Sequence, residues 1–133
     1  MEKLIENILK KAKEDKKVLA VALFGSKARK EPNKDIDICI ILNKKHDNLE
    51  MSNIIISYLG IAKEKVDLSI FQQLPLYIRM RILKEGKILM VKNESALYDL
   101  AFSTIKEFDS YKKLYYMYLK EVGNGSRKNI IKN

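Results

Sequence analysis

The chain has 133 residues, which suits one domain, and 47% of them are apolar against 32% charged, a composition that excludes a disordered chain. A single cysteine, Cys39, excludes an internal disulfide and a Cys-based zinc cluster and favours a reducing cytoplasm, while the short apolar runs exclude a membrane span. A formal net charge of +9 favours an anionic partner, such as a nucleotide, a nucleic acid or an acidic protein, although scattered lysines are equally typical of a solvated surface.

Apolar periodicity predicts helices and strands in the order α-β-β-α-β-α-β-α. In chain order we expect a helix over 3–15, strands over 18–24 and 35–42, a helix over 48–60, a strand over 65–71, a helix over 74–86, a short edge strand over 87–91 and a long helix over 95–121. Gly60 and Gly86 stand where helix C-caps are expected, and Asn93 is a typical helix-start residue. This order predicts an α/β (α+β) fold in which a small mixed sheet of about four strands is packed with helices.

A single domain is predicted over residues 1–121, because no repeat, low-complexity segment or long linker divides it. Residues 122–133 are rich in glycine, asparagine and basic residues and are expected to form a flexible basic tail. The start of the chain is charged and lacks the apolar stretch of a signal peptide.

Two carboxylates, Asp35 and Asp37, interrupt a strand that is otherwise apolar. Side chains two residues apart on a strand share a face and lie roughly 6.5 Å apart at their Cα atoms, so both acids point the same way as Cys39 and Ile41. Like charges repel unless a cation lies between them, and Mg²⁺ prefers such oxygen ligands. The alternative is a loop end and an edge-strand salt bridge, because Asp-x-Asp alone is a common pattern.

The turn before these acids strengthens the metal interpretation. The preceding strand leads into Gly25-Ser26 and then Lys27 and Arg29, a pattern typical of phosphate binding, because glycine lets the backbone approach and serine adds a hydroxyl. The Walker A pattern is absent. A third carboxylate, Asp67, lies on a strand that could neighbour the first two acids. Three carboxylates beside a phosphate site describe a two-metal phosphoryl-transfer site.

The segment LFGSKARKEPNKDIDICII, residues 23–41, resembles the signature of the polymerase-β-like nucleotidyltransferase superfamily: Gly-Ser, a spacer, then Asp-x-Asp. The short chain, the later VDL aspartate and LPLYIRMRILKEGKILMV, residues 74–91, resemble its minimal nucleotidyltransferases, the MNT proteins that are paired with HEPN or HEPT toxins. The resemblance covers residues 18–120 and is strongest over 24–41. It implies the superfamily's fold, closed by the long C-terminal helix.

The resemblance also implies the site residues and their tasks. The β- and γ-phosphates of ATP or another NTP would be held by Gly25, Ser26 and Arg29. The catalytic residues, which would also ligate two Mg²⁺ ions, would be Asp35, Asp37 and Asp67. Asp67 would complete the second metal site and help to activate the acceptor hydroxyl.

The sequence departs from the family pattern in the spacer. Lys30 and Lys34 stand where the family usually has glycine and serine, and the spacer is about two residues shorter. This departure predicts a reshaped nucleotide loop or weakened catalysis. Because all three carboxylate positions are filled, an active enzyme is favoured.

The function implied by the resemblance is Mg²⁺-dependent transfer of AMP from ATP to a tyrosine hydroxyl of a cognate HEPT/HEPN toxin, by a protein that acts as antitoxin. The first alternative is a catalytically silent antitoxin or nucleotide-binding module that neutralises its partner by contact. The second is a small-molecule nucleotidyltransferase. A nucleic-acid partner is less favoured, because the chain has no room for the gripping domains of polymerases. A homo-oligomer stays open, and no membrane partner is expected.

The remaining candidates favour structural roles. His46 follows two lysines in a predicted loop and is expected to be inert, and Cys39 is expected to pack as a small apolar residue. Arg79 and Arg81 are expected in surface salt bridges rather than on nucleotide phosphates. The tyrosine-rich segment at 108–120 is expected to pack in the core or between copies, although an exposed aromatic stripe would also suit a protein partner.

Overall fold

The structure, a computed structural model, describes residues 2–25, 36–62 and 66–132, with the side chains of residues 3–123 within those ranges. The helices and strands occur in the predicted order. They are α1 (Glu2–Glu14), β1 (Val18–Phe24), β2 (Ile36–Leu42), α2 (Asn48–Ala62), β3 (Val66–Ile70), the short 3-10 helix η1 (Phe71–Gln73), α3 (Leu76–Glu85), β4 (Lys87–Val91) and α4 (Glu94–Lys132).

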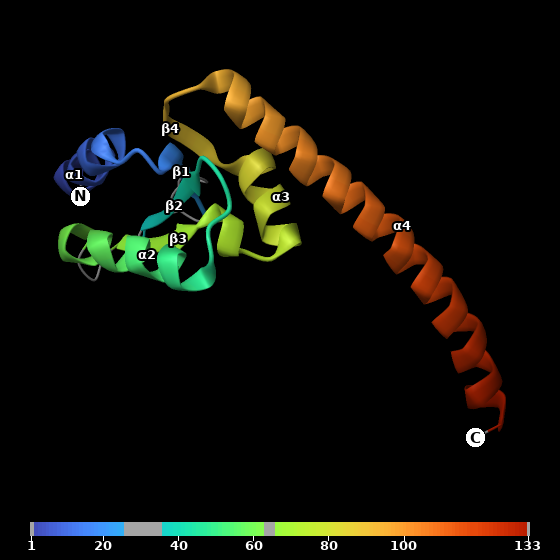
Figure 1. Ribbon diagram of the computed structural model, residues 1–133. Helices are drawn as coiled ribbons and strands as arrows, with labels where there is room; N and C mark the ends of the chain where they lie inside the picture. Colours follow the sequence, from blue (N-terminus) through green and yellow to red (C-terminus); the bar gives the residue numbers. More distant parts are fainter. Residues whose placement is uncertain (1, 26–35, 63–65, 133) are drawn as a thin grey trace.

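The four strands form one mixed sheet in the order β3-β2-β1-β4 (Figure 1). β1 pairs antiparallel with both β2 and β4, whereas β2 and β3 are parallel. Parallel neighbours need a crossover connection, and α2 supplies it between β2 and β3. The predicted fold class is confirmed, including the edge position of β4.

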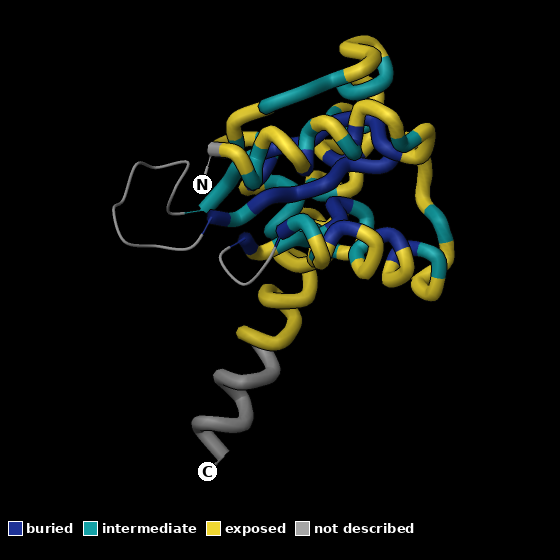
Figure 2. The backbone as a smooth tube through the Cα atoms, turned by 90° about the vertical axis from the view of Figure 1, so that its left-hand side faces the viewer, coloured by how far each residue is buried: buried dark blue, intermediate teal, exposed yellow. Residues whose placement is uncertain are grey.

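The sheet separates two apolar layers. On one face, α1 and α2 cover the side chains of Ile36, Ile38, Ile40 and Leu42, all of which are buried. On the other face, α3 and the first turns of α4 cover a smaller cluster that includes Cys39. Figure 2 shows the buried strands lying between the exposed outer surfaces of the helices. The alternation predicted for β2 is therefore confirmed.

The ends of two helices differ from the prediction. α2 does not end at Gly60 but continues to Ala62, because Ala62 is buried in the core and its packing extends the helix beyond the glycine. A Cβ at Gly60 would meet no atom within 4 Å, so nothing around it requires glycine. α4 starts as predicted, since the Asn93 side chain accepts a hydrogen bond from the Ala96 N–H at 3.0 Å. It then runs past the predicted end at residue 121, to Lys132.

The second half of α4 projects away from the domain (Figure 1). Every side chain from 109 to 123 is exposed, and the helix of 39 residues is about 58 Å long. The tyrosines of this segment do not pack in the core, because the helix has left the domain before it reaches them. Their packing between copies, the other half of the expectation, stays a prediction. The division into a domain over 1–121 and a flexible tail stays a prediction.

Within the described residues, no helix is both long enough and apolar enough to cross a membrane.

The isoleucines of β2 should dominate the stability of the domain. Ile38 is fully buried, so Ile38→Ala should lower the free energy of unfolding by about 2–5 kcal/mol in urea denaturation. Ile56 on α2 is 61% exposed, and Ile56→Ala is the matched control, with an expected change below about 0.5 kcal/mol. Equal losses from the two variants would contradict the observed packing.

Candidate functional site

Asp37 and Asp67 lie side by side on neighbouring strands. They are register partners in the parallel pairing of β2 with β3, and register partners on adjacent strands project from the same face about 4.8 Å apart at their Cα atoms. Asp37 is half-buried and Asp67 is exposed. The structure thus brings together two of the three predicted carboxylates on the sheet face that α3 and α4 cover.

Gly25 contacts the carboxylate of Asp37. Its φ of +79° places it in the left-handed region at the end of β1, where Phe24 is the register partner of Asp37. A Cβ on Gly25 would overlap with Oδ2 of Asp37 and would lie 3.1 Å from its Cγ. Glycine is therefore required twice here, by the backbone conformation and by the neighbouring carboxylate.

The other predicted site residues belong to the segment between β1 and β2. Ser26, Arg29 and Asp35 lie outside the described residues, so their predicted roles stay predictions. Among the described residues, no group of three His, Cys, Asp or Glu side chains is close enough to hold a metal ion. The two acids on β2 and β3 supply two oxygen-bearing side chains, and the predicted third ligand is Asp35.

Below the acids, the same sheet face becomes apolar. Cys39 is the register partner of Ser69, one pair further along the face from Asp37 and Asp67. Burial raises the pKa of the Cys39 thiol to about 12, and the neighbouring Ser69 hydroxyl offsets part of this effect. The expectation that Cys39 packs as a small apolar residue is confirmed, since its side chain is buried among Ala20, Ala22 and their neighbours.

Arg79 and Arg81 form salt bridges, as predicted, and His46 also lies in a structural contact, which was not predicted. Arg79 on α3 reaches Glu107 on α4 at 3.4 Å, and Arg81 contacts Glu85 at 3.5 Å within α3. His46 Nδ1 lies 3.1 Å from Glu50, which also pairs with Lys17 at 2.9 Å. Lys17 and His46 together lower the pKa of the Glu50 carboxyl.

The contact between Gly25 and Asp37 was missed by the sequence reasoning, which assigned Gly25 to phosphate alone. The signal was present in part, because a glycine ends the first strand and an acid begins the second. It could be interpreted only with the register of β1 against β2, which pairs Phe24 with Asp37.

Comparisons with known proteins show which family the sequence matches and which folds are similar. The sequence profile described as polymerase beta, nucleotidyltransferase, matches residues 6–95, from α1 to the start of α4. A relative from Methanocaldococcus jannaschii, which carries the provisional name protein adenylyltransferase, is 40% identical over 75 residues. The match covers 55% of this chain and 56% of the relative, so the chain spans about half the length of the curated relative that it matches.

Two solved structures have a similar fold. One is a tri-AMPylated Shewanella oneidensis HEPN toxin in complex with MNT antitoxin, with a TM-score of 0.64, 21% identity, and coverage of 92% of this chain and 98% of that chain. The other is a toxin–antitoxin structure with AMP-PNP, with a TM-score of 0.64, 21% identity, and coverage of 88% and 97%. At this level of identity the likeness shows the fold.

The close contact at Gly25 gives a test by double-mutant cycle. Gly25→Ala should lower the free energy of unfolding by about 2–4 kcal/mol, because alanine is strained at φ +79° and its Cβ overlaps with the carboxylate. In an Asp37→Ala background only the backbone strain remains, so the loss should shrink by at least about 1 kcal/mol. Additive losses in chemical denaturation would contradict the contact.

The buried thiol gives a second test. The pKa of the Cys39 thiol is about 12 in the native state, whereas the unfolded thiol ionises near pH 9. The stabilisation from the raised pKa is therefore complete below about pH 8.5 and is lost as the pH rises toward 12. The stability difference between the wild type and Cys39→Ala should therefore fall with rising pH in alkaline urea titrations. A difference that does not change with pH would contradict the raised pKa.

Proposed function

The chain belongs to the polymerase beta nucleotidyltransferase family, and on that premise we propose that it transfers AMP from ATP to a tyrosine hydroxyl of a cognate HEPT/HEPN toxin and acts as its antitoxin. The observation that carries the proposal is the pairing of Asp37 with Asp67, in register and on one face, beside the glycine turn at the end of β1. Two carboxylates held side by side support the proposal, because two-metal nucleotidyl transfer uses such acids as metal ligands.

The comparisons support the choice of acceptor. The relative from Methanocaldococcus jannaschii carries the name of a protein adenylyltransferase, and one solved structure pairs an MNT antitoxin with an AMPylated HEPN toxin. Another toxin–antitoxin structure contains the ATP analogue AMP-PNP, which supports ATP as the donor. The cytoplasm is the proposed location, because the buried Cys39 is kept as a free thiol.

The donor atoms of the site fit Mg²⁺, which prefers carboxylate oxygens and tolerates incomplete protein ligation because substrate phosphates complete its shell. We propose Asp35, Asp37 and Asp67 as the ligands of two such ions. When bound, these ions would neutralise the triphosphate and the charge that develops during transfer.

The chain's own residues position the reactants. Gly25 leaves its backbone open to the β- and γ-phosphates, and Ser26 and Arg29 are proposed to hold the same groups. Asp67 is exposed at the edge strand β3, where an acceptor hydroxyl can approach and pass its proton to the carboxylate. The hydroxyl oxygen then bonds to the α-phosphorus, the bond to the β-phosphate oxygen breaks, and pyrophosphate leaves.

The test is intact mass spectrometry after incubation with ATP and Mg²⁺, with and without a purified candidate HEPT/HEPN toxin as the partner. We expect the partner to gain the mass of one or more adenylyl groups. Asp37→Asn and Asp67→Asn should each reduce the initial rate by at least about 100-fold, because each removes a charged ligand. Asp99→Asn, an exposed acid on α4, is the matched control and should keep the wild-type rate.

Each contrary outcome selects an alternative. A tight complex with the partner and no mass change, with ATP and with other NTPs, would indicate a silent antitoxin, the reading that the short spacer favours. Nucleotide consumption without any protein partner would indicate a small-molecule acceptor. Full activity of the two Asn variants would contradict the proposed carboxylate site.

A further inference from the structure

The two edge strands of the sheet differ in how well they are protected. β4, at one edge, begins with Lys87, and its pairing with β1 is interrupted by a register shift between Val21 and Ala22. β3, at the other edge, pairs with β2 without a shift, and its second half, Leu68–Ile70, contains no charged residue. Charges and bulges are the usual protection of a sheet edge, so the second half of β3 is the more open of the two edges.

The backbone of β3 has hydrogen-bonding groups on its outer side. The N–H and C=O groups of alternate residues on a strand point to opposite sides, so β2 pairs with only half of those on β3. Within the part of the chain that the structure describes, the backbone of Val66–Ile70 makes no hydrogen bond beyond its pairing with β2. Another extended chain would satisfy the remaining groups, because it carries the same donors and acceptors at the same spacing.

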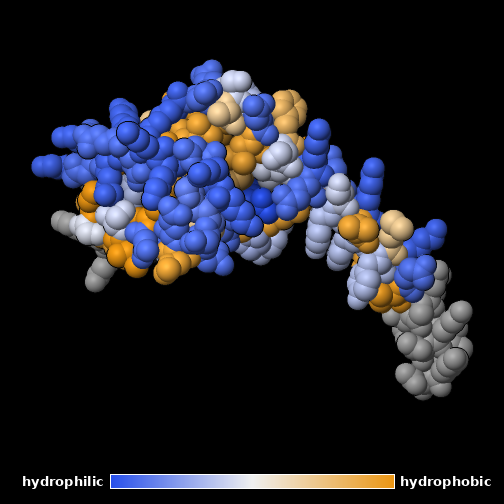
Figure 3. Space-filling view, in the orientation of Figure 1, coloured by the Kyte–Doolittle hydropathy of each residue, from blue (hydrophilic) through white to orange (hydrophobic). Residues whose placement is uncertain are grey.

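An apolar groove of about 330 Å³ lies along this edge. It is lined by Leu68, Ser69 and Ile70 of β3, by Ser52, Ile55 and Ile56 of α2, and by Gln73 and Leu74. Ile56 is 61% exposed, and Figure 3 shows hydrophobic side chains at the surface of α2. An apolar groove beside an open strand is the arrangement by which a sheet binds an extended peptide, because the main chain pairs and alternate side chains fill the groove.

The shape of the groove favours a single extended segment over a second copy of the chain. A second copy would offer its own β3, but that strand is flanked by the same residues of α2 and by the same Gln73 and Leu74. Two hollow edges placed together would leave both grooves unfilled, whereas the apolar side chains of a bare segment would fill one. The occupant that fits is therefore an extended segment whose alternate residues are apolar.

The same strand carries one of the candidate catalytic acids. Asp67 shares its sheet face with Asp37 and directly precedes the residues of β3 that line the groove. Residues opposite one another on neighbouring strands project from the same face, about 4.8 Å apart at their Cα atoms. A segment that pairs with β3 would therefore place one side chain beside Asp67. Its side chains opposite Leu68 and Ile70 would project from the other face, toward α2.

We propose that the acceptor protein binds as an extended segment that adds to the sheet along β3, with the hydroxyl residue that receives AMP opposite Asp67. The segment carries apolar residues at the first and third positions on one side of that hydroxyl residue, opposite Leu68 and Ile70 and next to Ile56. The choice of acceptor rests on the proposed function, but binding of the segment needs neither ATP nor Mg²⁺. The failure of this inference and the failure of the transfer reaction can therefore be distinguished.

Fluorescence anisotropy with short labelled peptides tests the binding without the reaction. One peptide has isoleucine at the first and third positions after a central tyrosine, and a second has them before it, because the segment can run parallel or antiparallel to β3. At least one of the two should bind at least about tenfold more tightly than a peptide in which both isoleucines are serine. Equal binding of the isoleucine and serine peptides, or no binding of any of them, would overturn the proposal.

Backbone methylation tests whether the bound peptide pairs as a strand. Only every second N–H of a paired strand points to its neighbour, so N-methyl groups on one alternate set of residues should weaken binding at least about tenfold. N-methyl groups on the other set leave the inward N–H groups and all side chains in place, and should change the affinity less than about threefold. Equal effects of the two sets would overturn the strand pairing.

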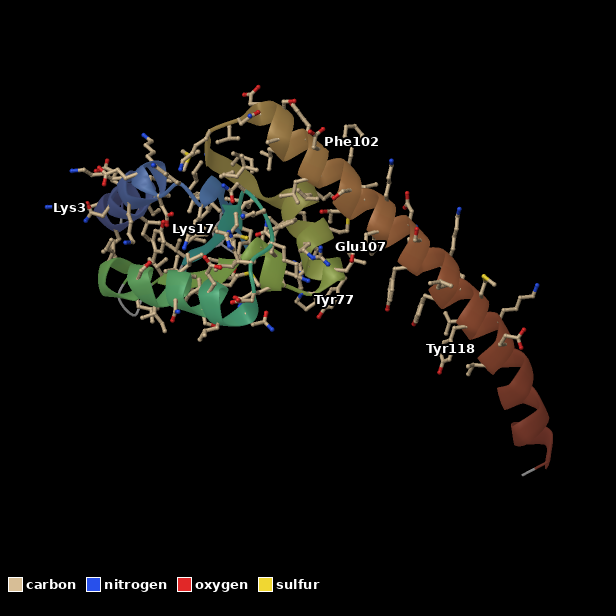
Figure 4. All side chains as sticks on the ribbon, in the orientation of Figure 1. Lys3, Lys17, Tyr77, Phe102, Glu107 and Tyr118 are labelled. Atoms are coloured by element: carbon tan, nitrogen blue, oxygen red, sulfur yellow. The ribbon has the colours of Figure 1, made fainter. Side chains whose placement is uncertain are left out.

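Ile56→Ala tests the groove in the protein itself, and it should weaken binding of the peptide at least about fivefold. Two control variants remove exposed apolar side chains elsewhere. Ile88, on the opposite edge strand, is 41% exposed, and Phe102, on the side of α4 turned away from α3 in Figure 4, is 63% exposed. Ile88→Ala and Phe102→Ala should each change the affinity less than about twofold. Equal effects of the three variants would overturn the assignment to this groove.

Sedimentation velocity on the wild type tests the competing occupant. A monomer over the concentration range of the binding assay is the expected result. A dimer that is abolished by Ile56→Ala would show that a second copy occupies the groove, and would overturn the proposed occupant.

AMP transfer to the purified candidate toxin separates this inference from the proposed function. Ile56→Ala should raise the KM for the toxin at least about fivefold and leave kcat within about twofold, because the groove binds the acceptor without touching the reacting atoms. Transfer with an unchanged KM would overturn the groove as the acceptor site and leave the proposed function standing. Alternation-dependent peptide binding without any transfer would support strand addition at β3 and contradict the proposed function.

Discussion

The alternation of side chains along β2 is the constraint on which both the core and the candidate site depend. Ile36, Ile38 and Ile40 face α1 and α2, while Asp37 faces the opposite side between them. Because the side-chain period of a strand is two, a slip of one residue would turn Asp37 into the apolar core and expose the isoleucines. Burying an unpaired carboxylate is strongly unfavourable, so the same pattern that stabilises the core also fixes the direction of the acid.

The neighbouring strands extend this constraint to the rest of the site. Antiparallel pairing with β1 sets Phe24 opposite Asp37, and the next residue, Gly25, therefore lies against the Asp37 carboxylate. Parallel pairing with β3 sets Asp67 beside Asp37. The site thus joins residues far apart in the sequence without needing long side chains to reach one another. Rigid strands position both acids, which is the condition for holding ligands at a fixed separation.

Much of this architecture could be predicted from the sequence, because the strands are short segments rich in apolar residues. Along β2 and β3, the acids occupy positions that alternate with the buried apolar side chains. The register of the strands was not predictable, because it depends on which strands pair. The steric role of Gly25 was not predictable for the same reason. The prediction that α2 ends at Gly60 was wrong for a related reason. A glycine favours a helix end locally, but the burial of Ala62 beyond it outweighed that local preference.

The tyrosines of α4 illustrate a different limit. A heptad of apolar residues has the same appearance in the sequence whether its partner is the domain, a second copy or another protein. Only the geometry divides this pattern at Phe108, because α3 lies beside the first half of α4 and the helix then leaves the domain. The exposure of the tyrosines beyond Phe108 is therefore set by where the domain ends, a property of the whole fold that the pattern along a single helix does not contain.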